Sequence, residues 1–204
     1  MTAALINPFM PMDATVSRRA ERRMKGRLQI PCAAMPKEHY PFTPDPAKNA
    51  LLARNGTALL IGMCLDQQVR TEKAMSGPYD LQERLGHLDA RKIASMPLAR
   101  LQAVFRRPPA LHRFPGMMAK RVRALCAIIA REYGGNGARL WARAISATDV
   151  YERLRALPGF GESKAKAGVH ILAAYGKHKL AGWRRYAVPD ALPWEFRKGT
   201  KIDR

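Results

Sequence analysis

Apolar residues recur at helical spacing along most of this chain, and no segment alternates apolar and polar residues as a half-buried strand would. The clearest helix covers residues 118–133, where the apolar stripe ends at a pair of glycines. The stripe consists of Val122, Leu125, Cys126, Ile129 and Tyr133. We therefore predict an all-α fold, with a helical domain over residues 48–182.

Four other segments also carry helix signals. The stretch TALLIGMCLDQQVRTEKAM, residues 57–75, predicts one helix that is buried until Asp66 and polar beyond it, with a turn over residues 76–80. Residues 88–96 and 97–106 predict two short amphipathic helices, the second starting at its proline. The sequence ISATDV predicts a capping box at the start of the next helix.

Both ends of the chain differ from the middle in composition. Residues 1–47 contain seven of the fifteen prolines and the basic run SRRAERRMKGR, which predicts a partly disordered arm. Residues 183–204 mix aromatic and basic side chains. Such rings either cover the core or stack against a nucleic-acid base, and we expect this segment to pack on the domain.

Charge limits the class of partner. The chain has 36 Lys and Arg against 16 Asp and Glu, a net charge of +20, and residues 90–131 hold ten basic residues and no acidic one. Such an excess predicts a polyanionic partner, above all nucleic acid. No transmembrane helix is expected, because no run of about 18 apolar residues occurs. An anionic membrane surface is the weaker alternative to nucleic acid, and we expect no membrane partner. The three cysteines lie far apart, which favours a reduced intracellular location, in the cytoplasm or nucleoid, and offers no metal-ligand spacing.

The stretch LPGFGESKA, residues 157–165, places two glycines in a sharp turn between two predicted helices. Gly159 and Gly161 can take positive φ and leave the backbone accessible, and Leu157 and Phe160 would anchor the turn in the core. The first N–H groups of a helix and its positive end bind anions. With Lys164 and Lys166 close by, the sequence predicts that this turn binds a phosphate. The alternative is an ordinary helix corner.

These residues resemble the helix-hairpin-helix (HhH-GPD) superfamily of base-excision DNA glycosylases, and in particular its endonuclease III-like members. The resemblance covers the order of segments from about residue 57 to residue 176, including ALLIGMCLDQQV and FPGMMAKRVRALCAIIAREYGG. It implies a helical bundle with a DNA-binding cleft, double-stranded DNA as the partner, and base-excision repair as the role. We expect the protein to act as a monomer.

The resemblance assigns DNA-binding roles to two groups of residues. The hairpin would hold a DNA phosphate with its backbone amides, and its carbonyls would hold K⁺ or Na⁺, the one cofactor implied. A Gln-bearing turn would enter the gap left by an extruded base, unless these glutamines only solvate a helix end. The residues assigned to DNA are Gly159, Phe160, Gly161, Glu162, Ser163, Lys164, Gln67 and Gln68, and the basic helix adds Lys120 and Arg121.

The resemblance further implies hydrolysis of an N-glycosidic bond with the help of an aspartate. The candidate is Asp190, which follows the hairpin later than in the family, and the alternative is Asp66. Ser163 stands where bifunctional members have their Schiff-base lysine, so we expect a monofunctional hydrolase without efficient lyase activity. No cysteine follows Cys126, so no iron–sulfur cluster is expected. If neither aspartate serves, the chain is a non-catalytic protein that binds distorted or abasic DNA.

Overall fold

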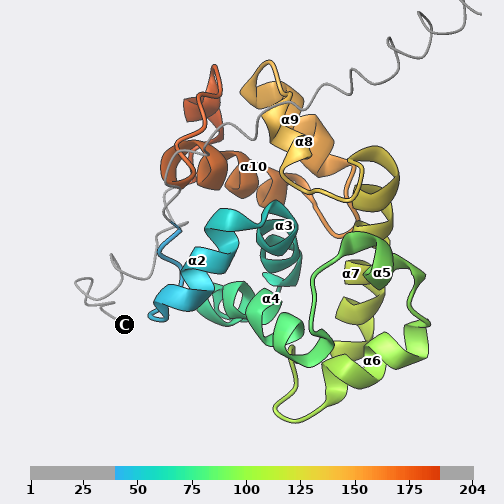
Figure 1. Cartoon of the computed structure of the whole chain (residues 1–204). Helices are drawn as coiled ribbons and strands as arrows, with labels where there is room; N and C mark the ends of the chain where they lie inside the picture. Colours follow the sequence, from blue (N-terminus) through green and yellow to red (C-terminus); the bar gives the residue numbers. More distant parts are fainter. Residues whose placement is uncertain (1–39, 189–204) are drawn as a thin grey trace, which may run out of the picture. The chain divides into compact units, whose positions relative to one another are not determined.

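Nine α-helices and no β-strand occur between residues 40 and 188, the part of the chain that this computed structural model describes (Figure 1). The helices are α2 Pro46–Arg54, α3 Gly56–Leu65, α4 Thr71–Leu85, α5 Ala90–Ser95, α6 Leu98–Arg106, α7 Pro115–Glu132, α8 Arg139–Ala142, α9 Ala147–Arg155 and α10 Glu162–His170. A π-helical turn, Ile171–Tyr175, continues α10, and a 3-10 turn, Trp183–Tyr186, follows it. The predicted all-α class is confirmed for these residues.

Helix α3 is buried along its whole length. It packs against α2, α4 and α7, which explains why its sequence is apolar on every side. The side chain of Asn55 starts the helix by accepting hydrogen bonds from the N–H groups of Thr57 and Ala58, at 3.0 and 3.1 Å. The carboxyl end of α3 therefore emerges from a fixed position in the core.

The prediction of one continuous helix over residues 57–75 is wrong. Helix α3 ends at Leu65, and residues 66–70 turn before α4 begins at Thr71. Gln68 has a φ of 53°, in the left-handed region that a helical path cannot contain. Residues 66–70 are called the glutamine turn below.

The predicted turn over residues 76–80 is also wrong, because α4 continues through Pro78. Gly77 and Pro78 are buried, and the missing side chain of Gly77 makes room for Leu65 of α3. Packing of α4 against α3 thus outweighs the local tendency of Gly-Pro to end a helix.

Helices α5 and α6 pack against α7. Asp89 caps α5, and Pro97 is the N-cap residue of α6, as its place in the sequence predicts. The predicted stripe of α7 is confirmed, because it faces the core: Val122, Leu125, Cys126 and Ile129 are buried and Tyr133 is half-buried.

Helices α9 and α10 pack against each other as a hairpin. Ser146 begins α9, and its hydroxyl accepts the N–H of Asp149 at 3.2 Å, which agrees with the predicted cap. The carboxylate of Asp149 also holds Arg153 one turn later, at 2.7 Å. Both contacts stabilise the first turns of α9.

The described parts of the two ends pack on the helical core. Phe42 is buried and meets the ring of Tyr175 edge-on, at 5.8 Å between ring centres. Tyr186 is buried and stacks on Tyr151, at 5.0 Å. The predictions for residues 1–39 and 189–204 lie outside the described residues. Among residues 40–188, no helix combines the length and the apolar character needed to cross a bilayer.

Candidate nucleic-acid interface

The turn between α9 and α10 has the left-handed backbone that its glycine predicts. Gly159 has a φ of 82°, a value that costs a residue with a side chain about 1–2 kcal/mol. Leu157 and Phe160 are buried on either side of it, as predicted, and fix the turn in the core. Gly159 and Gly161 themselves are exposed.

Gly161 does not take the positive φ that we expected for both glycines. Its φ is −81° and its ψ is −179°, the extended conformation of an N-cap residue. A Cβ at this position would meet no atom within 4 Å. Neither backbone strain nor internal packing therefore requires glycine here.

The first N–H groups of α10 have no partner in the described structure. The N–H of Phe160 is used within the turn, because it donates to the carbonyl of Leu157 at 3.1 Å. The first helical bond of α10 is from Ala165 to the carbonyl of Gly161, at 3.0 Å, and no side chain caps the helix. This leaves four adjacent donors, the N–H groups of residues 161–164, at the positive end of the helix.

A pocket of about 460 Å³ opens in front of these donors. Its lining joins the hairpin to two residues predicted from distant parts of the sequence: Gln67, Arg121, Gly159, Phe160, Gly161, Glu162, Ser163 and Lys164. The structure thus brings together eight of the ten residues predicted to bind DNA. Gln68 and Lys120 are exposed but do not line this hairpin pocket.

Cys64, at the end of α3, attaches the hairpin to the core from both its side chain and its backbone. Its thiol lies 3.9 Å from the carbonyl of Pro158, and its carbonyl accepts the ammonium of Lys164 at 3.0 Å. Burial raises the pKa of the thiol to about 11, so it stays protonated and can donate at neutral pH. No local sequence pattern predicts these contacts, because they join residues about 100 positions apart in the chain.

Lys164 is half-buried and points toward the end of α3, not into solvent. Its ammonium also lies 5.7 Å from the ring centre of Phe160, and burial lowers its pKa. Lys166, in contrast, forms an exposed ion pair with Glu162 at 2.7 Å. Of the two lysines expected near a phosphate, only Lys164 lines the pocket.

The glutamine turn is held in place by residues from two other segments. The guanidinium of Arg121 donates to the side-chain carbonyl of Gln67. The ring of His112 lies 3.1 Å from the backbone carbonyl of the same glutamine. The next residue, Gln68, is exposed and keeps its left-handed conformation. A non-glycine residue held in this way is often found where a ligand is clamped.

Asp66 lies at the first position of the glutamine turn and is half-buried. The hydroxyl of Thr71 lies 3.4 Å from its carboxylate, and its negative charge partly offsets the lowering of the Lys164 pKa by burial. It does not line the hairpin pocket. The other candidate carboxylate, Asp190, lies outside the described residues.

The basic side chains of residues 90–131 lie at the surface. None of the ten Lys and Arg residues is buried. They lie on α5, α6, α7 and the connecting segments, and Arg121 carries this charge into the hairpin pocket. Unpaired positive charge of this kind attracts polyanions.

The family resemblance implies a K⁺ or Na⁺ ion on the hairpin carbonyls, but two of these carbonyls already have partners. That of Leu157 accepts the N–H of Phe160, and that of Pro158 faces the thiol of Cys64. Each of these carbonyl oxygens keeps a second lone pair, so the two contacts do not decide whether an ion binds, and the implied K⁺ or Na⁺ stays a prediction. Among the described residues, no three His, Cys, Asp or Glu side chains are grouped as metal ligands.

The pH dependence of stability tests whether His112 holds the glutamine turn. Its Nδ1 accepts the N–H of Phe114 at 3.0 Å, so a neutral ring donates from Nε2 to Gln67. Burial lowers the pKa of His112, so the unfolded state binds its proton more tightly. Its contribution to stability is complete above the unfolded pKa of about 6.5 and is lost as the pH falls.

We therefore expect the free energy of unfolding in urea to fall from about pH 7 to pH 5, and to fall less in His112→Gln. His170, whose pKa burial also lowers, keeps part of the slope in both proteins. Equal slopes in wild type and His112→Gln would contradict this role.

Comparison of the sequence with models of protein families and with curated proteins finds no match. The function is therefore proposed from the residues of the site, their geometry and the resemblance carried by the hairpin sequence.

Proposed function

We propose that this protein binds double-stranded DNA and acts in base-excision repair, as a monofunctional DNA N-glycosylase. The observation that supports DNA binding most directly is the row of four N–H donors at residues 161–164, which face an exposed pocket and have no partner in the described structure. A backbone phosphate has the charge and the acceptor oxygens that such a row binds. Arg121 in the pocket wall adds a positive charge.

In the proposed complex the hairpin pocket holds one DNA strand and the glutamine turn contacts the bases. Gln68 is exposed, and the turn is fixed through Gln67 by Arg121 and His112. An amide side chain can donate to and accept from several base edges, which suits a residue that enters the place of an extruded base. The glutamine turn, which these contacts hold in place, would then be the part of the protein that opens the duplex.

Hydrolysis by water fits the site better than imine chemistry. Ser163 occupies the position of the family's Schiff-base lysine and is exposed. The amine of Lys164, one residue later, donates to the carbonyl of Cys64 and lies 5.7 Å from the ring centre of Phe160. A lyase needs a free amine directed at the sugar. A carboxylate that orients water and stabilises the developing positive charge on the sugar is the proposed catalyst.

One observation favours a second function, binding of distorted or abasic DNA without catalysis. Among the described residues that line the hairpin pocket, Glu162 is the one carboxylate, and it is exposed and paired with Lys166. A catalytic carboxylate must therefore come from another part of the chain. The two functions share the same DNA contacts and differ in base release.

Binding is tested by the salt dependence of affinity, measured by fluorescence anisotropy with a labelled duplex. Each neutralised phosphate releases counterions, so we expect affinity to fall at least about tenfold between about 50 and 200 mM salt. A flat response would exclude both functions.

A base-release assay then separates the glycosylase from the non-catalytic protein. The protein is incubated with duplexes that contain uracil, hypoxanthine, alkylated purines or oxidised bases, and the duplexes are then treated with alkali. Strand breakage in none of them would favour the latter.

A further inference from the structure

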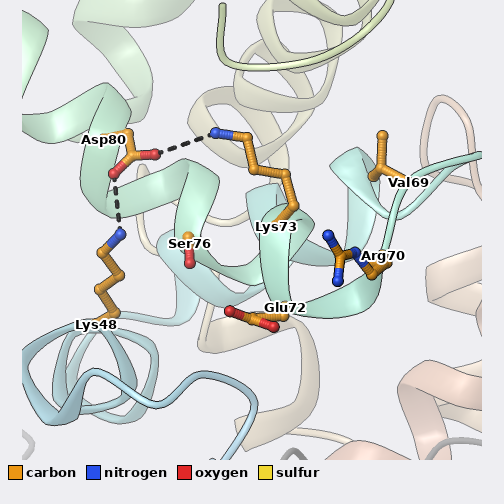
Figure 2. Close-up of a pocket in the computed structure, with 7 residues that line it drawn as sticks. All are labelled: Lys48, Val69, Arg70, Glu72, Lys73, Ser76 and Asp80. Atoms are coloured by element: carbon orange, nitrogen blue, oxygen red, sulfur yellow. Dashed lines mark hydrogen bonds and ion pairs between the residues drawn. The ribbon is translucent and has the colours of Figure 1, made fainter. Parts of the chain in front are cut away.

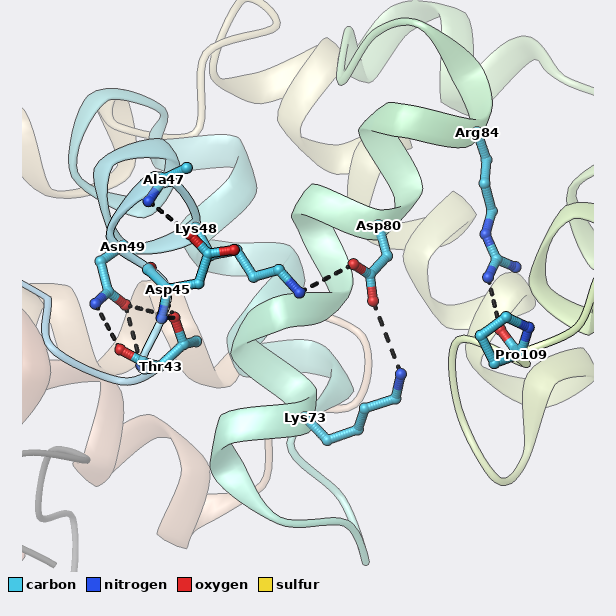
Figure 3. Close-up of polar contacts among 9 residues, drawn as sticks. All are labelled: Thr43, Asp45, Ala47, Lys48, Asn49, Lys73, Asp80, Arg84 and Pro109. Carbon is cyan, nitrogen blue, oxygen red and sulfur yellow. Dashed lines mark hydrogen bonds and ion pairs between the residues drawn. The ribbon is translucent and has the colours of Figure 1, made fainter. Parts of the chain in front are cut away.

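Arg84, in the last turn of α4, donates hydrogen bonds to three backbone carbonyls that belong to another part of the chain. Its Nη1 lies 2.8 Å from the carbonyl oxygen of Val104 and 2.9 Å from that of Arg107, and its Nη2 lies 2.6 Å from that of Pro109. Figure 3 shows the guanidinium directed at Pro109. Val104 is in α6, whereas the other two are in residues 107–114, which join α6 to α7 and are called the α6–α7 connection below.

The α6–α7 connection makes few hydrogen bonds through its own N–H groups. Two of its residues are prolines, which have no N–H to donate. Among the described residues, two of its N–H groups, those of Arg107 and Leu111, donate to backbone carbonyls, and both carbonyls belong to α6. A planar guanidinium can reach several acceptors at once. Arg84 therefore supplies hydrogen bonds that attach the connection to α4.

Arg84 projects from a helix that other elements hold in place. Helix α4 packs against α3 and α6. One turn before Arg84, Asp80 lies between two lysines: the ammonium of Lys48 in α2 is 3.3 Å from its Oδ1, and that of Lys73 is 3.7 Å from its Oδ2 (Figures 2 and 3). Each of these partly exposed pairs adds little to stability, but the pair with Lys48 joins α4 to α2. The guanidinium of Arg84 therefore extends from a defined position.

The far end of the α6–α7 connection reaches the glutamine turn. His112 is 2% exposed, and its Nε2 lies 3.1 Å from the backbone carbonyl of Gln67. Its Nδ1 accepts the N–H of Phe114 at 3.0 Å, which fixes the orientation of the ring. The connection is therefore attached to α4 through Arg84 and to the glutamine turn through His112.

Arg84 lies too far along α4 to touch the glutamine turn itself. Helix α4 begins at Thr71, directly after the turn. An α-helix rises about 1.5 Å per residue, which places Arg84 about 20 Å along the helix axis from Thr71. The chain thus leaves the turn along α4, and the contacts of Arg84 return to the turn through the α6–α7 connection and His112. This closed path gives Arg84 a means of acting on residues that it does not contact.

We propose that Arg84 is a positioning residue for the glutamine turn, an inference that rests on the proposed DNA binding. By holding the carbonyls of the α6–α7 connection, Arg84 sets the place from which His112 bonds to Gln67, and so keeps Gln68 in place to enter the duplex. Without the guanidinium, water replaces the bonds to the exposed carbonyls but does not fix their positions, so the connection gains conformations in which His112 is displaced. The hairpin has its own attachments at Cys64, so its binding of phosphate should remain.

The first test separates opening of the duplex from binding. A duplex carries 2-aminopurine opposite an abasic site, since the emission of this base rises when it leaves the stack, and saturating wild-type protein should raise that emission. Arg84→Met, which keeps the apolar stem, should reduce the rise to less than about half, while its affinity for the same duplex stays within about twofold of wild type. Arg143→Met removes the same charge from the exposed end of α8 and is the matched control, for which we expect the wild-type rise.

The second test needs no DNA and asks whether Arg84 acts through His112. Unfolding in urea is measured for wild type, Arg84→Met, His112→Gln and the double variant. If Arg84 positions His112, the free energy of unfolding lost on His112→Gln should be at least about halved in the Arg84→Met background. The same loss should be unchanged in the Arg143→Met background, because residues that neither touch nor depend on each other give additive losses.

Arg84→Lys keeps the charge but not the planar fork and should show both effects in weaker form, so it replaces Arg84→Met in both tests if that variant does not fold. Loss of salt-dependent binding in the wild type overturns the proposed function, and the unfolding test still decides whether Arg84 supports His112. Salt-dependent binding by the wild type without a rise in emission overturns only the inference. A folded Arg84→Met protein that binds DNA with the wild-type rise overturns it too. So do equal losses on His112→Gln with and without Arg84.

Discussion

We expect Gly161→Asp to make the protein more stable and, at the same time, to weaken its DNA binding at least about tenfold. The backbone at this position already has the extended conformation of an N-cap residue, and a Cβ meets no atom within 4 Å. An aspartate can therefore accept the free N–H groups of α10 and place its charge at the positive end of the helix, which adds about 0.5–1 kcal/mol to stability. The same carboxylate occupies the donors proposed for a phosphate and repels it.

The opposite signs of these two effects distinguish a binding role from general damage to the fold. Stability is measured by urea unfolding and affinity by anisotropy in the same buffer. Ala47→Asp is the control, because it introduces the same charge near the exposed start of a different helix, α2, and should leave affinity within about twofold of wild type. Gly161→Asn keeps the cap without the charge and should give an intermediate loss. Wild-type affinity in the stabilised Gly161→Asp protein would contradict the hairpin as the phosphate site.

Asp190→Asn is expected to slow base release by about 10²–10⁴-fold while leaving DNA affinity unchanged or slightly higher. The amide keeps the size of the side chain, but it can neither take a proton from water nor stabilise a positive sugar by its charge. Single-turnover rates with the best substrate of the damaged-base panel give the measurement, since they separate chemistry from product release. Asp203→Asn, at the other aspartate after the hairpin, is the matched control.

Asp66→Asn completes the assignment of the carboxylate. The carboxylate of Asp66 is close to the hydroxyl of Thr71 and does not line the hairpin pocket, so we expect this variant to keep base release within about tenfold of wild type. The reverse pattern, in which Asp66→Asn removes activity and Asp190→Asn does not, would make Asp66 the catalytic residue. Full activity in both variants would mean that neither aspartate is catalytic.

Local sequence signals were reliable where one residue type alone decides the conformation. The stripe of α7, the caps at Ser146 and Pro97 and the left-handed Gly159 agree with their predictions, because each depends on neighbours within a few residues. The same reasoning failed at Pro78 and Gln68. There, burial of α4 against α3 and the clamp on the glutamine turn impose conformations that local propensity does not favour.

The candidate site also has features that the sequence predicts and contacts that only the tertiary structure shows. The sequence alone determined the all-α class of the described residues, the hairpin with its accessible glycine backbone and the large positive charge, because helical periodicity, glycine geometry and net charge are properties of short segments or of the whole composition. Only the tertiary structure decided that Cys64 holds the hairpin, that Arg121 and Gln67 face it, and that Lys48 of α2 meets Asp80 of α4. These contacts join residues far apart in the chain, and packing of the helices, which no local pattern encodes, determines which of them meet.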